Sequence, residues 1–224
     1  MRSVLLLSAG LDSSLNLYEA LRCSTVVLAV TFNYGQRAAM REIEFSERLC
    51  SKMKVKHRVI ELPWMTDFGM SSLVDRNKEI PTSAVRIDDL KVSRETAKSV
   101  WVPNRNGILL NIAAGFAESL SADWIVPGFN AEEAATFADN SQEFLVQQTK
   151  AFEFSTSNKV EVKCFTTGLR KTEIIKRGVE LGMDFELVWP CYFEAITPCG
   201  SCESCQRFER AANLNNVKTK WMKP

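Results

Sequence analysis

Residues 4–14 of the chain read VLLLSAGLDSS, and this stretch decides the class of fold. Its first part, Val4 to Leu7, is a short apolar run typical of a buried strand. The turn that follows is made of small and polar residues, and a helix is predicted from near Asp12 and Ser13, whose side chains can cap free backbone amides. A strand joined to a helix by such a turn is the repeating unit of α/β proteins.

Further apolar runs rich in β-branched residues alternate with segments of helical periodicity. This alternation predicts a parallel five-stranded sheet with helices on both faces, a Rossmann-like architecture. The polar stretch 66–99 lacks periodicity and is expected to be a functional lid or to be disordered in isolation. The predicted strands cover residues 4–7, 26–32, 58–62, 124–126 and 160–165, and the predicted helices cover residues 12–21, 37–52, 108–120, 142–152 and 171–181.

The composition favours one compact domain that acts on a small polar substrate. The chain has 224 residues, of which 46% are hydrophobic and 25% charged, a size at which one domain can bury its own core. A net charge of +1 argues against a nucleic-acid partner. No run approaches the ~20 apolar residues of a membrane span, and the N-terminus does not look like a signal peptide. We therefore expect a cytoplasmic protein, in which clustered cysteines bind metal more often than they form disulfides.

Four cysteines near the C-terminus have the spacing C-x7-C-x2-C-x2-C. Four thiolates on tight turns complete the tetrahedral coordination of Zn²⁺ and leave no open position, so we expect a structural zinc. An iron–sulfur cluster and a redox-active dithiol remain alternatives. The expected organisation is a nucleotide-binding domain over residues 1–185, with a zinc-binding segment over residues 186–224 packed on it. The four ligands are Cys191, Cys199, Cys202 and Cys205.

The turn after the first strand has the chemistry of an anion site. It lies where an α/β sheet binds ligands, and free amides, the positive end of a helix dipole and the hydroxyls of Ser8, Ser13 and Ser14 converge there. It lacks the lysine of a Walker loop and the three glycines of a dinucleotide fingerprint. Pyrophosphate is the expected ligand, and a plain strand-to-helix turn with serine caps is the alternative.

This S-x-G-x-D-S turn resembles the S-G-G-x-D-S loop of the ATP pyrophosphatases, the PP-loop enzymes, which cleave ATP between its α- and β-phosphates. The resemblance implies an adenine nucleotide alpha hydrolase-like fold and a loop that holds the departing pyrophosphate. Ala9 replaces the first glycine of the pattern, and it would be strained by roughly 1–2 kcal/mol if its φ were positive. The implied pyrophosphate-binding residues are Ser8, Ala9, Gly10, Leu11, Asp12 and Ser13, with Asp12 also holding the Mg²⁺ that accompanies ATP.

Three further segments extend the resemblance over nearly the whole chain. Residues 32–37 read FNYGQR, residues 102–106 read VPNRN and residues 198–205 read PCGSCESC. The turn at residues 8–13 is called the phosphate loop below. Together with it, the three segments are similar to the 7-cyano-7-deazaguanine synthases, a PP-loop family of queuosine-precursor biosynthesis. The resemblance implies that ATP adenylates 7-carboxy-7-deazaguanine, that ammonia displaces AMP to give an amide, and that a second adenylation allows dehydration to the nitrile. It also implies a homodimer.

Site residues follow from the resemblance and from their places after the predicted strands. Lys171 is expected to neutralise charge on the α-phosphate, and Arg105 to hold a phosphate or the substrate carboxylate. Together with Asp12 and Ser13 they form the expected catalytic set. The nucleotide is expected also to contact Tyr34, Gly35, Gln36 and Gly128, and the substrate to contact Arg105, Asn106, Phe129, Asn130, Glu132 and Asp139.

Two other functions share some of these features. A tRNA-thiolating PP-loop enzyme has the same phosphate loop, although it uses cysteines near the catalytic site and would suit a more basic chain. A non-catalytic zinc-bearing nucleotide-binding module would follow if Ala9 marked a decayed loop.

Overall fold

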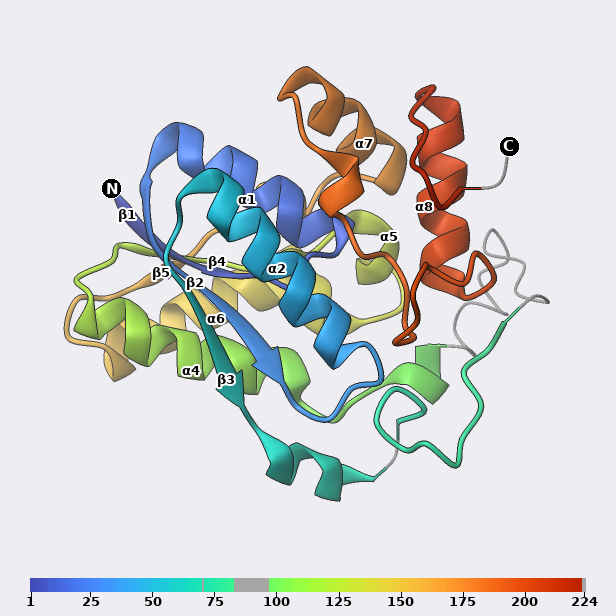
Figure 1. Ribbon diagram of the computed structural model, residues 1–224. Coiled ribbons are helices and arrows are strands. Elements are labelled where there is room, and N and C mark those ends of the chain that lie inside the picture. Colours follow the sequence, from blue (N-terminus) through green and yellow to red (C-terminus); the bar gives the residue numbers. More distant parts are fainter. Residues whose placement is uncertain (70, 83–96, 223–224) are drawn as a thin grey trace.

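The computed structural model describes residues 1–69, 71–82 and 97–222, and its centre is a five-stranded parallel sheet (Figure 1). The strand order is β3-β2-β1-β4-β5, so the first strand lies in the middle and confirms the predicted α/β class. The strands are β1 (Arg2–Leu6), β2 (Thr25–Asn33), β3 (His57–Glu61), β4 (Trp124–Val126) and β5 (Glu161–Val162).

The last strand is shorter than the predicted 160–165. The Lys163 amide still donates to the Ile125 carbonyl, but the Phe165 amide donates to the Asn16 side chain at 2.8 Å. The chain therefore leaves the sheet after Lys163, because a side chain of the first helix replaces the neighbouring strand as hydrogen-bond partner.

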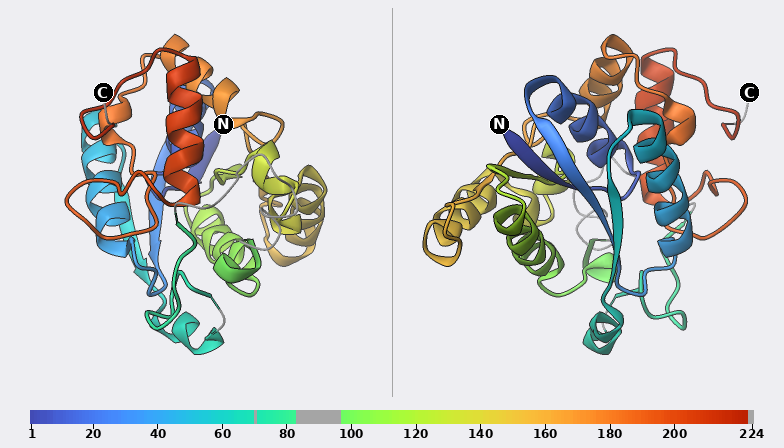
Figure 2. Two further views of the ribbon diagram at one scale, coloured as in Figure 1. Left: turned by 90° about the vertical axis from the view of Figure 1, so that its right-hand side faces the viewer. Right: turned by 60° about the vertical axis from the view of Figure 1, so that its left-hand side comes forward.

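Helices cover both faces of the sheet, as Figure 2 shows. One apolar core lies under α1 (Leu11–Cys23), α2 (Ala39–Met53), α7 (Lys171–Glu180) and α8 (Glu203–Leu214). A second core lies on the opposite face under α4 (Arg105–Ser119) and α6 (Gln142–Ser155). Short elements connect them: η1 (Pro63–Phe68), α5 (Ala131–Ala134), η2 (Ala138–Asn140) and η3 (Phe185–Leu187).

Two helix starts differ from the prediction in ways that matter for the site. Helix α1 begins at Leu11 with Gly10 as its N-cap and no side-chain cap, so the predicted capping by Asp12 and Ser13 is wrong. Both side chains lie in the first turn and line a cavity instead. Helix α4 begins at Arg105 rather than at residue 108, which places Arg105 at a helix N-terminus.

The four-cysteine segment ends in α8, a helix that the sequence analysis did not predict. Phe208, Ala211 and Ala212 of this helix are buried in the same core as Ile174 and Ile175 of α7. The polar stretch 66–99 is described at residues 66–69, 71–82 and 97–99, and the rest of the predicted lid lies outside the described residues.

Candidate functional site

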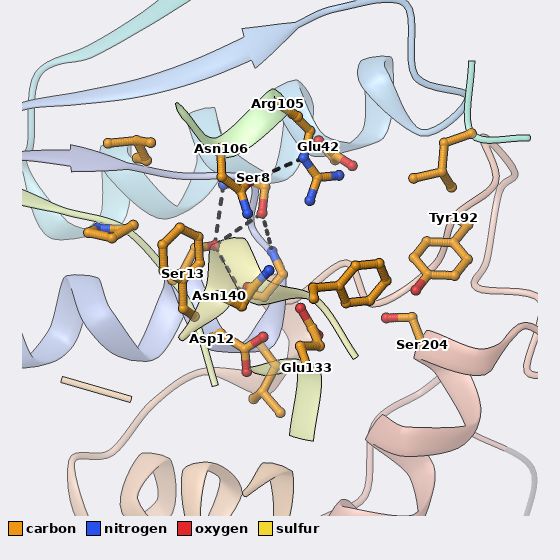
Figure 3. A pocket seen from close by; sticks show the side chains of 18 of the residues that line it. Ser8, Asp12, Ser13, Glu42, Arg105, Asn106, Glu133, Asn140, Tyr192 and Ser204 are labelled. Carbon is orange, nitrogen blue, oxygen red and sulfur yellow. Dashed lines mark hydrogen bonds between the residues drawn. The ribbon is translucent and has the colours of Figure 1, made fainter. Parts of the chain in front are cut away.

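A cavity opens at the carboxyl ends of β1, β2 and β4, the edge at which parallel α/β sheets bind ligands. The phosphate loop forms one wall, and the starts of α4 and α7 and the cysteine segment contribute others. Figure 3 shows Arg105 and Glu42 together on one side of this cavity and Asp12 and Glu133 on the other. Of the expected residues, the cavity is lined by Ser8, Gly10, Leu11, Asp12, Ser13, Tyr34, Arg105, Asn106, Gly128, Phe129, Asp139 and Lys171.

The phosphate loop keeps a left-handed residue at the position where the family pattern has glycine. Ala9 has a φ of 53°, and its carbonyl accepts a hydrogen bond of 2.8 Å from the Trp189 amide. The Ser8 and Ser13 hydroxyls lie 3.2 Å apart at the mouth of the loop. The chain therefore adopts the tight turn despite the methyl group of Ala9, which is fully buried away from the cavity.

Lys171 joins two carboxylates at the base of the cavity. Its Nζ lies 2.5 Å from Asp12 Oδ2 and 3.0 Å from Glu133 Oε1. Burial raises the pKa of Asp12 to about 6, against the opposing effect of the Lys171 ammonium. The pKa of Lys171 is raised, since the attraction of Asp12 and Glu133 outweighs its own desolvation. The lysine therefore carries its charge throughout the neutral pH range.

The same residues fit a divalent cation. Asp12 Oδ1 is buried and has no hydrogen-bond partner in the described structure, so an acceptor oxygen points into a polar site without a donor. Together with the Glu133 carboxylate it offers the oxygen ligands that Mg²⁺ prefers. Asn130 supports this arrangement from behind, because its side-chain amide donates to Asp12 Oδ2 at 3.0 Å.

Arg105 is the second cation of the cavity. Its Nη1 donates to the Tyr34 hydroxyl at 3.3 Å and its Nε to Asn106 Oδ1 at 3.2 Å, both of them uncharged partners. Within the described part of the chain no carboxylate forms an ion pair with it. A guanidinium with free donors in an enclosed site is suited to an anionic ligand group.

Sequence reasoning missed several cavity residues. Glu42 of α2 lines the cavity, and burial raises its pKa to about 7, although a hydrogen bond of 3.0 Å from Gln36 lowers it. Trp101 and Phe137 stack with an interplanar angle of 8° and ring centroids 5.9 Å apart. Glu42 could have been found from its place in the first turn of the helix after the second strand, but no local signal pairs Trp101 with Phe137.

Some expected site residues do not line the cavity. The backbone of Gly35 has a φ of 86° and turns the chain, while the Gln36 side chain accepts from the Tyr34 amide at 2.9 Å. Asn130 is fully buried, and it caps α5 as well as supporting Asp12. Glu132 does not line the cavity either, because its carboxylate binds Arg207 and Arg210 of α8 and the backbone amide of Lys171.

The four cysteines are brought together as predicted. The Sγ atoms of Cys191, Cys199, Cys202 and Cys205 all lie within 4.8 Å of one another. Backbone amides point at them: the Phe193 and Cys199 amides donate to Cys191 Sγ, and the Ser201 and Cys202 amides to Cys199 Sγ. Amide donors stabilise sulfur in its thiolate form, which is the form that binds metal. The cluster therefore fits a tetrahedral four-thiolate metal site.

A family model described as queuosine biosynthesis protein QueC matches residues 2–217. The 7-cyano-7-deazaguanine synthase of Bdellovibrio bacteriovorus is 56% identical over 219 residues, covering 97% of this chain and 95% of that protein. The one from Pelotomaculum thermopropionicum is 48% identical, covering 97% and 99%.

Solved structures of low sequence identity share the fold. A complex of a 4-thiouridine synthetase with RNA and bound ATP has a TM-score of 0.52 at 17% identity, covering 96% of this chain and 52% of that one. The U34-tRNA thiolase NcsA from Methanococcus maripaludis, with its [4Fe-4S] cluster, has a TM-score of 0.50 at 14% identity, covering 98% and 74%. None of the described helices has the length and apolar character needed to cross a membrane.

Proposed function

The chain belongs to the QueC family of queuosine biosynthesis proteins, and from this premise we infer that it is an ATP-dependent 7-cyano-7-deazaguanine synthase. Its substrates are then 7-carboxy-7-deazaguanine, ammonia and ATP. The observation that carries the proposal is the phosphate loop, which shares one cavity with Lys171, Arg105 and the Asp12 carboxylate. We expect a cytoplasmic enzyme in which residues 186–224 form a metal-binding part of the same domain.

Adenylation makes a poor leaving group into a good one, and the cavity residues fit that task. The free amides at the start of α1 and the Ser8 and Ser13 hydroxyls bind the departing pyrophosphate. The Lys171 ammonium and the Arg105 guanidinium stabilise negative charge that develops between the α-phosphate and the acyl oxygen. Asp12 and Glu133 would hold Mg²⁺, which supplies charge neutralisation on the phosphates.

One site can serve both stages of the reaction. The first stage activates a carboxylate oxygen for displacement by ammonia, and the second activates the amide oxygen so that it leaves as the nitrile forms. Both place an acyl oxygen next to the α-phosphate, so the same cations act twice. Phe129 and the stacked pair of Trp101 and Phe137 offer flat apolar surfaces for the deazapurine ring. The Asp139 carboxylate can accept hydrogen bonds from the ring N1–H and the exocyclic amine.

Ala9 has a left-handed backbone, the conformation that a glycine adopts readily, and this argues against a decayed, non-catalytic loop. The tRNA-thiolating alternative is supported only by a similarity of fold at 14–17% identity. The four clustered cysteines together fit one metal ion, and a cysteine bound to that ion could not carry sulfur.

A direct assay tests the proposal. The purified protein is incubated with ATP, Mg²⁺, ammonium and 7-carboxy-7-deazaguanine, and AMP, pyrophosphate and the nitrile are measured by mass spectrometry. Two AMP are expected for each nitrile, because each stage consumes one ATP. Absence of AMP with this substrate would overturn the proposal. Elemental analysis of the same preparation distinguishes one zinc per chain from iron.

A further inference from the structure

We propose that Glu132 is a positioning residue that fixes the catalytic Lys171 by joining the start of α7 to helix α8 of the four-cysteine segment. This inference rests on the proposed function, in which Lys171 stabilises charge at the α-phosphate. It also gives the cysteine segment a role in catalysis besides stability.

The Glu132 carboxylate contacts both helices at once. Its Oε1 accepts the backbone amide of Lys171 at 2.9 Å. Its Oε2 accepts from Arg207 Nη1 at 2.8 Å and from Arg210 Nη2 at 2.7 Å, two residues of α8. The side chain is only 11% exposed, so these charge-assisted contacts are poorly screened by water.

Glu132 binds the backbone of Lys171 at the N-terminus of α7, the point from which the lysine side chain extends into the cavity. Lys171 is the first residue of α7, so its amide has no partner within the helix and carries part of the positive end of the dipole. Besides this amide, the guanidinium groups of Arg207 and Arg210 donate to the same carboxylate. A carboxylate held by three donors therefore anchors the helix start.

Helix α5 holds both ends of the same lysine. Glu132 binds the Lys171 backbone, and the next residue, Glu133, binds its ammonium at 3.0 Å. The two glutamates are themselves fixed because Asn130 Oδ1 accepts both of their amides at 3.0 Å, while the Asn130 side-chain amide donates to Asp12. A continuous set of hydrogen bonds thus runs from α8 through Glu132 to the ammonium group in the cavity.

Replacing Glu132 by glutamine tests the link. Glu132→Gln keeps the shape but leaves Arg207 and Arg210 without their shared anion and weakens the anchor of the Lys171 amide. Since displacement of a catalytic group by about 1 Å can cost on the order of a hundredfold in rate, we expect kcat to fall at least tenfold, with a smaller change in KM for ATP. Glu203→Gln is the matched control: it removes another carboxylate partner of Arg207, at 2.7 Å, without touching Lys171, and should keep kcat within twofold.

A double-mutant cycle separates positioning from a merely structural role. AMP release from ATP labelled at the α-phosphate is measured for the wild type, Glu132→Gln, Lys171→Ala and the double variant, with bound metal and thermal transition as folding controls. If Glu132 acts through Lys171, its substitution has little further effect once the lysine is gone. Full multiplication of the two losses, or an unchanged kcat in Glu132→Gln, would overturn the proposal. An inactive wild type would instead refute the proposed function.

Should Glu132→Gln not fold, Arg210→Met takes its place in the same cycle. This variant removes one of the two α8 partners of Glu132 and leaves the bond to the Lys171 amide. A smaller loss of kcat that disappears in the Lys171→Ala background supports the link, and a wild-type kcat refutes it.

Discussion

A methyl group added at Gly128 should disable the phosphate loop while leaving the fold in place. Gly128 follows β4, and a Cβ built on it would lie 2.5 Å from the Ser13 amide nitrogen and 2.6 Å from Ser13 Cα. Ordinary contact at such a position begins at 3.4 Å, so the two backbones must separate by about 1 Å. Neither atom belongs to a flexible side chain that could swing away.

The expected loss is large for activity and moderate for stability. A shift of about 1 Å in the residues that hold pyrophosphate should lower kcat/KM on the order of a hundredfold. Overpacking costs roughly 1–3 kcal/mol, which corresponds to a fall in Tm of about 2–12 °C for a chain of this size. Gly128→Ala is assayed by AMP release and by thermal unfolding, next to Gly168→Ala, where nothing lies within 4 Å of the added atom. If Gly128→Ala kept wild-type kcat/KM, the close approach of these two backbones would not position the loop.

Four more substitutions test other parts of the site. Asp12→Asn should abolish AMP release and leave the thermal transition largely intact, and a collapse of folding would show that Asp12 is architectural. Cys202→Ser should lower bound metal and soluble yield together, and normal metal content, measured by elemental analysis, would contradict the ligand set. Glu42→Gln should remove part of the pH dependence of the free energy of unfolding. The pKa of Glu42 is raised from 4.5 to about 7 in the native state, which therefore binds the proton more tightly than the unfolded state. The stability of the wild type should then decline as pH rises from about 4.5 to 7. Between pH 5 and pH 8, the free energy of unfolding measured with denaturant should fall by about 1–3 kcal/mol less in the variant than in the wild type. Equal falls would refute the raised pKa of Glu42. Ala9→Gly should stay within about 1 kcal/mol of the wild type and keep its activity, because relief of strain is offset by the loss of a buried methyl and by a more flexible unfolded chain.

Features written locally in the sequence were predicted well. The α/β alternation, the turn between the first strand and the first helix, and the four-cysteine cluster each depend on residues close together in the chain, where periodicity and spacing carry the information. The first-turn position of Asp12 was misjudged because aspartate is a common N-cap, whereas here Gly10 holds that position and the carboxylate turns to Lys171.

Features made by packing between distant segments were not predictable in the same way. The bonds from Glu132 to Arg207 and Arg210 span 75 and 78 residues. A glutamate after a strand end is equally suited to a ligand or to a buried arginine, and only the docking of α8 decides between them. The raised pKa of Glu42 likewise arises from its enclosure in the cavity, not from its neighbours in the chain.

Ala9 replaces the first glycine of the S-G-G-x-D-S pattern, and the structure shows what this replacement does to the backbone. From the sequence, alanine in place of glycine indicates either a changed turn or a strained one, and the two have opposite consequences for function. The φ of 53° shows that Ala9 adopts the strained, left-handed conformation. Two features stabilise this conformation: the Ala9 methyl is fully buried, and the Trp189 amide donates a hydrogen bond of 2.8 Å to the Ala9 carbonyl. Trp189 lies two residues before Cys191, so the four-cysteine segment contacts the phosphate loop directly. Loss of a metal bound by these cysteines should therefore impair the binding of pyrophosphate before the sheet itself unfolds.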